Sequence, residues 1–240
     1  MELKEFSIKL KALAEKINVE LTENNIENFY KYMNLLIEWN NKMNLTAIIE
    51  PNDIILKHFI DCLVIDKYIK NDSTIIDVGT GAGFPGVPLS FVNEKSNFTL
   101  MDTLNKRIKF LDEVVHITNS KNIKNIHARA EELAKNKDYR EKFDFATSRA
   151  VASLNVLLEY MLPFVKVNGY CICMKGSNVK DELDNAKNAL NILGGIIEDV
   201  IEFDLPDTDI GRSIVIIKKI KQTPNKYPRK AGTPSKEPIV

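Results

Sequence analysis

The most informative part of this 240-residue chain is residues 77–89, which read Asp77-Val78-Gly79-Thr80-Gly81-Ala82-Gly83-Phe84-Pro85-Gly86-Val87-Pro88-Leu89. A short apolar run rich in β-branched residues, 74–76, precedes it and predicts a buried parallel strand. Gly79, Gly81 and Gly83 stand at alternate positions, where the absent Cβ lets the backbone turn sharply and approach a ligand. Pro85 suits the first turn of a helix, because its missing N–H is not needed there. A strand, a glycine turn and a helix N-terminus in this order predict a nucleotide-type binding element.

Two carboxylates indicate which ligand this element binds. Residues 81–86 formally satisfy the dinucleotide fingerprint G-x-G-x-x-G, but Asp77 at the end of the strand would repel a pyrophosphate. An ammonium group on a ligand without phosphates suits that carboxylate better, as in S-adenosylmethionine. Asp102 ends the next expected strand, 19 residues after Gly83, where a carboxylate can accept hydrogen bonds from both ribose hydroxyls. We therefore predict an S-adenosylmethionine site; the competing interpretation is a tight turn that binds nothing.

Length and composition predict a folded protein of one large domain, or one domain with an extension. No apolar run approaches the roughly 20 residues that span a bilayer. The charged residues 1–6 are unlike a secretory signal. The three cysteines, Cys62, Cys171 and Cys173, lack metal-ligand spacing, and the last two alternate in an apolar strand as core residues. We expect a cytoplasmic monomer that holds no metal and does not enter a membrane.

The residue pattern divides the chain into three regions. Residues 1–70 place apolar side chains at helical spacing, with Thr22 and Pro51 at the starts of two helices. Through residues 71–221 strands and helices alternate, which predicts a parallel sheet covered by helices on both faces. Residues 222–240 contain four prolines and predict an extended basic arm.

The second region has the order of elements of a known fold. Its expected strands are 74–78, 98–102, 123–127, 143–148, 169–174, 196–203 and 212–220, and its expected helices lie near 86–92, 104–119, 151–161 and 178–193. The last two strands are separated by residues 206–209 without a helix, so they should form an antiparallel hairpin. A sheet of about seven strands that ends in such a hairpin is the S-adenosylmethionine-dependent methyltransferase variant of the doubly wound, Rossmann-like α/β fold.

A formal net charge of zero hides a basic C-terminus, because seven basic residues and one acidic residue lie between Lys218 and Val240. Lys226, Arg229 and Lys230 stand among prolines that keep the segment extended. We therefore predict that they contact the phosphates of an RNA, which supplies affinity and position with little sequence readout. On charge alone, a solvated tail that binds nothing is the alternative.

Several motifs along the chain resemble those of one family. In chain order they are Trp39-Asn40, 44–47, 57–63, 77–86, Lys106-Arg107, Phe110-Leu111, Ala130-Glu131, 148–152, Lys175-Gly176 and 227–234. Over nearly its whole length the chain resembles the bacterial 16S ribosomal RNA guanine-N7 methyltransferases (RsmG, glucose-inhibited division protein B). The family often has serine at the position of Cys62 and glutamate at that of Asp102. The resemblance implies methylation of one guanine in the decoding-region loop, with S-adenosylmethionine as cofactor and 16S rRNA or the small ribosomal subunit as partner.

The chemistry of guanine N7 fits the residues that come after the fourth expected strand. N7 presents a lone pair and no proton, so its attack on a sulfonium methyl needs neither a general base nor a covalent nucleophile. The chain has Ser148-Arg149-Ala150 there, and neither an Asn-Pro-Pro-aromatic motif nor a Pro-Cys nucleophile. We predict that Arg149 is the catalytic residue, at the crevice where open α/β sheets bind ligands. A surface ion pair is the alternative for Arg149.

The predicted cofactor-binding residues are Asp77, Gly79, Gly81, Gly83, Phe84, Asp102, Thr103, Leu104, Ala130, Glu131 and Arg149. Glu131 could equally serve to begin a helix, and Phe84 could be a core residue. His58 and Asp61, one helical turn apart, receive no role.

Two other functions stay open at this point. A small-molecule methyltransferase would use the N-terminal helices as a lid, and the basic arm argues against it. A non-enzymatic RNA-binding or ribosome-assembly module would keep only the fold, and the intact glycine turn with its two acidic residues argues against that. A dinucleotide-dependent dehydrogenase is the least favoured function, because Asp77 and Pro85 fit a dinucleotide site poorly.

Overall fold

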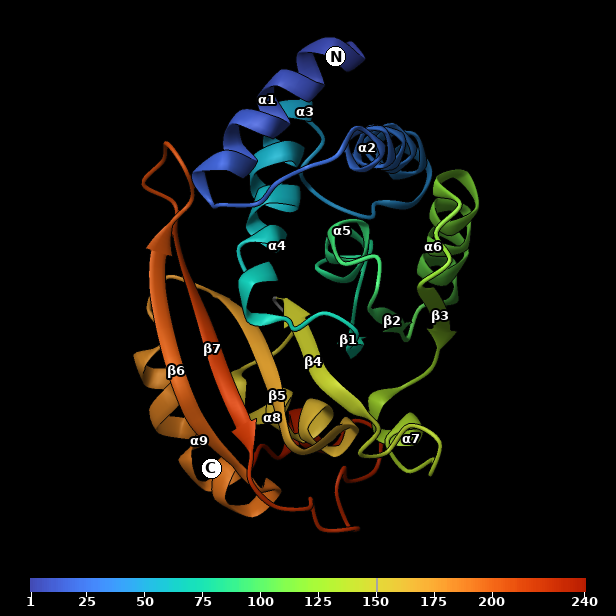
Figure 1. The fold of residues 1–240 in the computed structure, drawn as a ribbon. Coiled ribbons are helices and arrows are strands. Elements are labelled where there is room, and N and C mark those ends of the chain that lie inside the picture. Colours follow the sequence, from blue (N-terminus) through green and yellow to red (C-terminus); the bar gives the residue numbers. More distant parts are fainter. Residues whose placement is uncertain (150) are drawn as a thin grey trace.

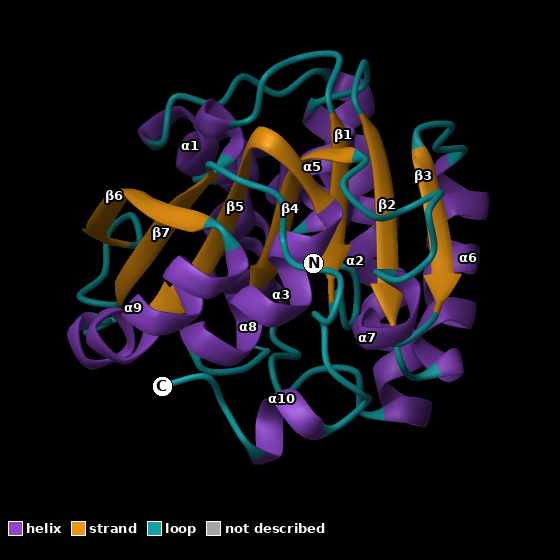
Figure 2. Ribbon diagram, turned by 90° about the horizontal axis from the view of Figure 1, so that it is seen from below, coloured by secondary structure: helices purple, strands orange, loops and turns teal. Residues whose placement is uncertain are grey.

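The computed structural model describes residues 1–149 and 151–240. At its centre is one seven-stranded sheet with the order β3-β2-β1-β4-β5-β7-β6, and Figure 2 shows the strands lengthwise, side by side. The strands are β1 (Thr74–Val78), β2 (Asn97–Asp102), β3 (Ile123–His127), β4 (Phe143–Arg149), β5 (Val165–Gly176), β6 (Gly195–Asp204) and β7 (Gly211–Lys219). The first five are parallel, and β7 runs antiparallel to both β5 and β6. The predicted doubly wound sheet with a terminal hairpin is confirmed.

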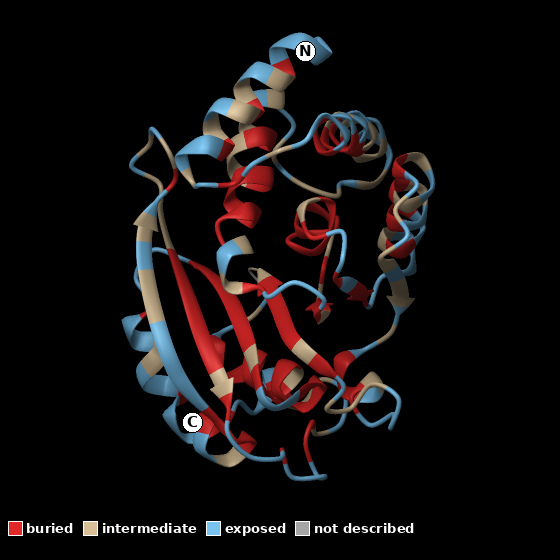
Figure 3. Ribbon diagram, viewed as in Figure 1, coloured by how far each residue is buried: buried red, intermediate tan, exposed pale blue. Residues whose placement is uncertain are grey.

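Helices cover both faces of this sheet (Figure 1). One face carries α5 (Gly86–Val92), α6 (Asn105–Thr118) and the N-terminal helices, and the other carries α7 (Ala130–Leu133), α8 (Leu154–Met161) and α9 (Lys180–Leu193). Because successive strand residues point to opposite faces, Ile75 belongs to the first core and Ile76 to the second. Cys171 and Cys173 are both fully buried in the second core, as predicted. Of the described strands, β6 at one edge is the most exposed (Figure 3), and β3 at the other edge has no buried residue.

The N-terminal helices share their core with the sheet. They are α1 (Leu3–Lys16), α2 (Glu23–Met43) and a broken helix made of α3 (Pro51–Ile54), a π-helix (Ile55–Ile60) and α4 (Asp61–Leu63). The Thr22 hydroxyl accepts from Asn25 N–H, and the Asn25 side chain accepts from Thr22 N–H, so the predicted start of α2 is a capping box. Tyr32 of α2 stacks on Phe59 at a ring distance of 5.5 Å. None of the described helices is long and apolar enough to cross a membrane.

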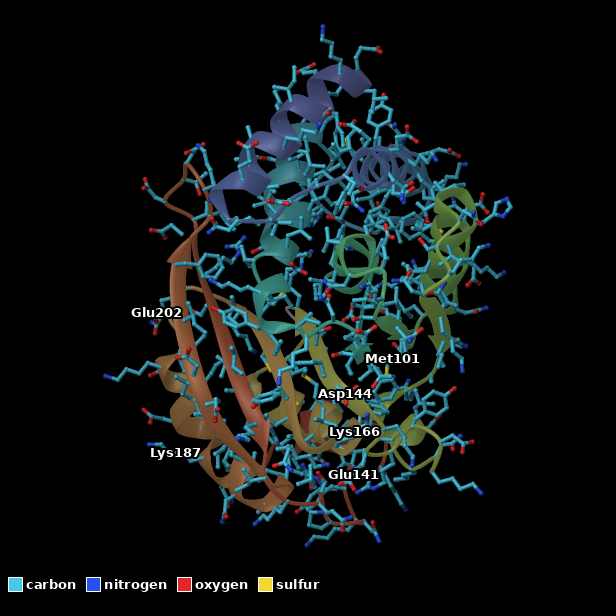
Figure 4. The ribbon with its side chains drawn as sticks, in the orientation of Figure 1. Met101, Glu141, Asp144, Lys166, Lys187 and Glu202 are labelled. Atoms are coloured by element: carbon cyan, nitrogen blue, oxygen red, sulfur yellow. The ribbon has the colours of Figure 1, made fainter. Side chains whose placement is uncertain are left out.

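The amino ends of the central strands are closed by polar contacts. Lys166 Nζ lies 2.7 Å from Asp144 Oδ1, and Figure 4 shows these two side chains together below β4. Lys219 is completely buried and donates to Glu141 Oε1 at 2.6 Å and to two backbone carbonyls. Pairing a buried charge in this way avoids the large desolvation penalty of an isolated one. The opposite, carboxyl ends of β1, β2 and β4 border a cavity.

The prediction of an extended C-terminal arm is wrong. Residues 222–240 fold back onto α8 and include the short helix α10 (Thr233–Lys236). Tyr227 and Ile239 are buried in the second core, and the Arg140 guanidinium donates to the carbonyls of Thr223 and Tyr227. Prolines prevent regular structure but not docking, and burial of these apolar side chains favours the docked segment.

Candidate functional site

A cavity of about 460 Å³ lies at the carboxyl ends of β1, β2 and β4. The strand order reverses between β1 and β4, which is where open α/β sheets bind ligands. The volume falls within the roughly 300–1,000 Å³ of small-molecule sites. Its lining residues are Leu45, Thr46, His58, Val78, Gly79, Thr80, Gly81, Ala82, Phe84, Met101, Asp102, Thr103, Arg107, Ala128, Arg129, Ala130, Glu131, Arg149, Val151 and Tyr160.

The glycine turn forms the wall of the cavity next to β1. The N–H groups of Gly79 and Thr80 both donate to the carbonyl of Met101 on β2, which fixes the turn to the sheet. Gly81 has φ +62°, and a Cβ there would meet nothing within 4 Å, so its backbone is open to a ligand. Gly83 is different, because a Cβ would lie 2.6 Å from Val87 Cγ2. It therefore serves close packing and is not among the residues that line the cavity, and its predicted cofactor contact stays a prediction.

Asp77 supports the turn from below and does not line the cavity. Its Oδ2 accepts from Thr80 Oγ1 at 2.6 Å and from Gly86 N–H at 2.9 Å, so it joins the turn to α5. Its Oδ1 is buried without a partner among the described residues, and burial raises the pKa of this carboxyl to about 6. The contacts seen here are structural, and the predicted contact with a ligand's ammonium group stays a prediction.

Asp102 lines the cavity, and only 2% of this residue's surface is exposed. Its Oδ2 accepts from Gly81 N–H at 3.0 Å and from Arg107 Nη1 at 3.1 Å, and its Oδ1 accepts from Leu104 N–H at 2.8 Å. A carboxylate has about four acceptor positions, so about one remains for a ribose hydroxyl unless the half-exposed Arg107 moves. Thr103 lines the cavity; Leu104 is not among its lining residues, and its predicted cofactor contact stays a prediction.

The predicted pair Ala130 and Glu131 lies at the start of α7 and lines the far end of the cavity. Glu131 is buried, and its Oε1 accepts from Gly232 N–H at 2.9 Å. The C-terminal segment therefore supports this end of the site. Tyr160 of α8 also lines it, and no motif in the sequence indicated this residue.

Arg149 lines the cavity at the end of β4, as predicted, and its side chain is only 15% exposed. Its Nη1 donates to Asp61 Oδ2 and to the Lys57 carbonyl, both at 3.1 Å, and its Nη2 donates to His58 Nδ1 at 3.0 Å. Its guanidinium carbon lies 4.7 Å above the Phe84 ring. This burial excludes the alternative of a surface ion pair.

His58 and Thr46 also line the site, although their sequence positions predict no role for them. The His58 ring stacks on Phe84 with a centroid distance of 4.2 Å, and its Nε2 lies 2.9 Å from Thr46 Oγ1. Burial, and next the Arg149 charge, lower the pKa of His58 to about 3, so the imidazole is neutral at neutral pH. Their roles depend on the direction of hydrogen bonds, which residue spacing does not reveal.

The cavity fits S-adenosylmethionine. The open backbone at Gly81 and the remaining acceptor position of Asp102 suit its ribose, and the enclosed end beside Ala130 and Glu131 suits its adenine. Among the residues that the structure describes, no group of three His, Cys, Asp or Glu side chains is arranged to hold a metal ion.

Known proteins share this architecture. A solved structure from Aquifex aeolicus described as a SAM-dependent methyltransferase has the same fold, with a TM-score of 0.54 at 18% identity, covering 72% of this chain and 96% of the other. The fold of this chain is therefore the fold of S-adenosylmethionine-dependent methyltransferases. A family model for rRNA small subunit methyltransferase G (GidB) matches residues 25–210. The chain therefore belongs to the rRNA small subunit methyltransferase G family.

Two curated relatives agree over the whole length. The ribosomal RNA small subunit methyltransferase G of Alkaliphilus oremlandii is 54% identical over 241 residues, which cover 100% of both chains. The protein of the same name from Acetivibrio thermocellus is 54% identical over 228 residues, which cover 95% of this chain and 94% of its own. The family resemblance found in the sequence is thereby confirmed.

Proposed function

We propose that this chain methylates N7 of one guanine in the decoding-region loop of 16S ribosomal RNA, with S-adenosylmethionine as methyl donor. Its relatives are named for methylation of small-subunit rRNA, which supports the substrate class. The choice of N7 and of the loop comes from the family resemblance. We further propose that the protein acts as a cytoplasmic monomer on the rRNA or the small subunit.

The observation that carries the proposal is that the acidic and imidazole groups on the described cavity wall are already held by protein partners. His58 Nδ1 accepts from Arg149, Asp102 accepts from three donors, and Glu131 accepts from the C-terminal segment. None of them is arranged as a free general base. Guanine N7 carries no proton, so a site without such a base suits it, whereas methylation of an amine or hydroxyl calls for proton removal.

The residues of the site then act by binding, orienting and polarising. When bound, S-adenosylmethionine supplies an electrophilic methyl group on a sulfonium. Asp102 and the Gly81 backbone hold the ribose end of the ligand, while Ala130 and Glu131 enclose its adenine. Three of the five N–H donors of Arg149 are directed at Asp61, Lys57 and His58, so the residue keeps the wall rigid and contributes a fixed positive charge. A donor placed on N7 would occupy the reacting lone pair, so a cation held away from N7 by these contacts is compatible with catalysis.

Phosphate contacts are proposed for two of the three basic residues predicted to make them. Lys226 and Lys230 are exposed on the docked C-terminal segment. Arg229 instead donates through Nε and Nη2 to the buried Glu159, so its main role is to hold the segment and only its Nη1 is left for a phosphate. Replacing Lys226 and Lys230 by glutamine should weaken RNA association and reduce its salt dependence by about one unit of slope per contact. Unchanged affinity and slope would remove these two residues from the RNA interface.

Methyl transfer from labelled S-adenosylmethionine to intact small subunits, naked rRNA and metabolite pools tests the proposed function. Label should enter 16S rRNA, and the labelled base should be a guanine that becomes sensitive to chain cleavage by reduction and aniline treatment. Replacing the target by 7-deazaguanosine, which lacks N7, should abolish labelling. Labelling of a small metabolite only, or of the deaza substrate, would contradict the proposal.

A further inference from the structure

Thr46 is held in place at both its backbone and its side chain. Its N–H donates to Asn40 Oδ1 at 2.8 Å, and its Oγ1 lies 3.0 Å from the N–H of Ile48. The same oxygen lies 2.9 Å from His58 Nε2. Thr46 lines the cavity together with His58 and Arg149. It is thus a preorganised polar group at the reaction cavity.

The direction of each hydrogen bond in this chain of contacts follows from Arg149. A guanidinium can only donate, so His58 Nδ1 must accept from Arg149 Nη2. A neutral imidazole with an accepting Nδ1 carries its proton on Nε2, which must therefore donate to Thr46 Oγ1. The Ile48 N–H also donates to that oxygen. Both lone pairs of the Thr46 hydroxyl are then filled.

Only the hydroxyl proton of Thr46 remains to be used. None of the described residues accepts a hydrogen bond from it. Since the oxygen can accept nothing more, Thr46 presents a donor, and only a donor, to whatever occupies this side of the cavity. Ordinary serine and threonine hydroxyls can rotate to suit either a donor or an acceptor. Here the contacts with Arg149, His58 and Ile48 remove that freedom.

We propose that the Thr46 hydroxyl donates a hydrogen bond to O6 of the target guanine and so selects guanine over adenine. This inference rests on the proposed function. Guanine presents N7 and O6 as neighbouring acceptors, whereas adenine presents an amino group in place of O6. A donor on O6 leaves the N7 lone pair free for the methyl group. The same donor would face the N–H groups of adenine without an acceptor, which disfavours that base.

The surroundings of Thr46 favour the substrate side of the site. His58 and Arg149 also line a second cavity of about 310 Å³, next to Lys57 and Arg212. Arg212 donates through Nε to Asp61 and through Nη1 to a carbonyl, while no described residue accepts from its Nη2. Basic side chains there suit the sugar–phosphate of an incoming nucleotide. Asp102 and Glu131, which would hold the ribose and adenine of the cofactor, line the first cavity but not the second.

The test compares two bases in three proteins: the wild type, Thr46→Val and Thr46→Ser. Small-subunit rRNA is ligated to carry either guanosine or 2-aminopurine riboside at the target; 2-aminopurine keeps N7 but lacks O6. The wild type should transfer methyl to guanosine roughly three- to tenfold more efficiently, as kcat/KM, than to 2-aminopurine. Thr46→Val, which removes the hydroxyl at nearly constant shape, should lose that preference by lowering the guanosine rate only. Thr46→Ser should retain it, because the hydroxyl remains.

The outcomes separate this inference from the proposed function. If the wild type methylates guanosine but Thr46→Val keeps the full preference over 2-aminopurine, the O6 contact is overturned while the proposed function stands. If Thr46→Val weakens S-adenosylmethionine binding in calorimetry and leaves the base preference intact, the hydroxyl serves the cofactor and the inference again fails. If the wild type methylates no rRNA, the proposed function fails first. Melting temperatures of both variants establish that the fold is intact.

Discussion

Arg149 and Arg212 share one buried carboxylate, that of Asp61. Arg149 Nη1 lies 3.1 Å from Asp61 Oδ2, and Arg212 Nε lies 3.1 Å from Asp61 Oδ1. The Asp61 side chain is only 5% exposed, and burial raises its pKa while the two arginines oppose that rise. Each Asp61 oxygen is paired with one arginine. Removing either arginine therefore leaves one oxygen of a buried carboxylate without its ion-pair partner.

We predict that Arg149→Ala lowers methyl transfer on the order of 10²–10³-fold, as expected when a preorganised charge and the wall that it holds are lost. Unlike the substitution of a surface arginine, Arg149→Ala should also lower the free energy of unfolding by about 1–3 kcal/mol, because Asp61 then retains only Arg212. Single-turnover assays and denaturant unfolding measure the two effects. Arg149→Lys is the matched control, since it keeps the charge but not the three directed donors. Wild-type turnover in Arg149→Ala would remove the residue from the mechanism.

Asp102→Ala should weaken S-adenosylmethionine binding by about 1–3 kcal/mol. The loss combines the hydrogen bond to ribose with the loosening of Gly81 and Leu104, whose N–H groups the carboxylate fixes. Asp102→Asn retains one oxygen acceptor and should show a smaller loss. Titration calorimetry on folded variants measures both. Unchanged affinity in the alanine variant would contradict the ribose assignment.

Arg229→Ala should destabilise the protein by roughly 2–4 kcal/mol, at the lower end for a broken buried pair because Arg229 is partly exposed. Its Nη2 lies 2.7 Å from Oε2 of Glu159, whose side chain is 1% exposed and would lose its partner. Cofactor affinity should fall as well, because Gly232, three residues on, supports Glu131 in the cavity wall. Thermal unfolding and calorimetry check this. The neighbouring, exposed Lys230 provides the control, since Lys230→Ala should change neither quantity; equal behaviour of the two variants would contradict docking of the segment.

Asp77 makes stability depend on pH in a predictable direction. Its folded pKa of about 6 lies above the ordinary value of 3.8, so between these values the folded protein keeps a proton that the unfolded chain has released. The contribution of Asp77 to the free energy of unfolding therefore falls as pH rises from about 4 to 6, and it stays low above that range. Asp77→Asn cannot titrate, so its stability relative to wild type should rise by about 1–3 kcal/mol across this window. Urea unfolding at pH 4, 5, 6 and 7 measures the difference; a difference independent of pH would contradict the raised pKa.

Local signals in the sequence account for most of the fold and for part of the site. The strand 74–78 and the helix 86–92 are predicted to the residue because a β-branched run, three glycines and Pro85 mark them. Gly81, Asp102 and Arg149 are correctly predicted at the cavity because motifs fix residues at strand ends, which meet at one edge of a parallel sheet. Such signals act over a few residues.

The features that sequence reasoning missed depend on contacts between distant segments. Glu159 and Arg229 are 70 residues apart, and nothing near either one indicates that the C-terminal segment docks. The turn at Asp77 is recognisable, but whether its carboxylate faces the ligand or the α5 backbone depends on packing. Thr46 and His58 acquire their roles only through Arg149, which comes about a hundred residues later in the chain.

The hydrogen bond between Gly232 and Glu131 affects when the cavity wall forms during protein synthesis. During synthesis the chain emerges from the N-terminus, so the glycine turn and Asp102 are released well before Gly232. The Gly232 N–H, 101 residues after Glu131, reaches that carboxylate only once the segment between them has been made. A nascent chain that lacks Gly232 therefore leaves Glu131 without this partner, and the cavity wall at α7 gains its support only after the C-terminal segment docks.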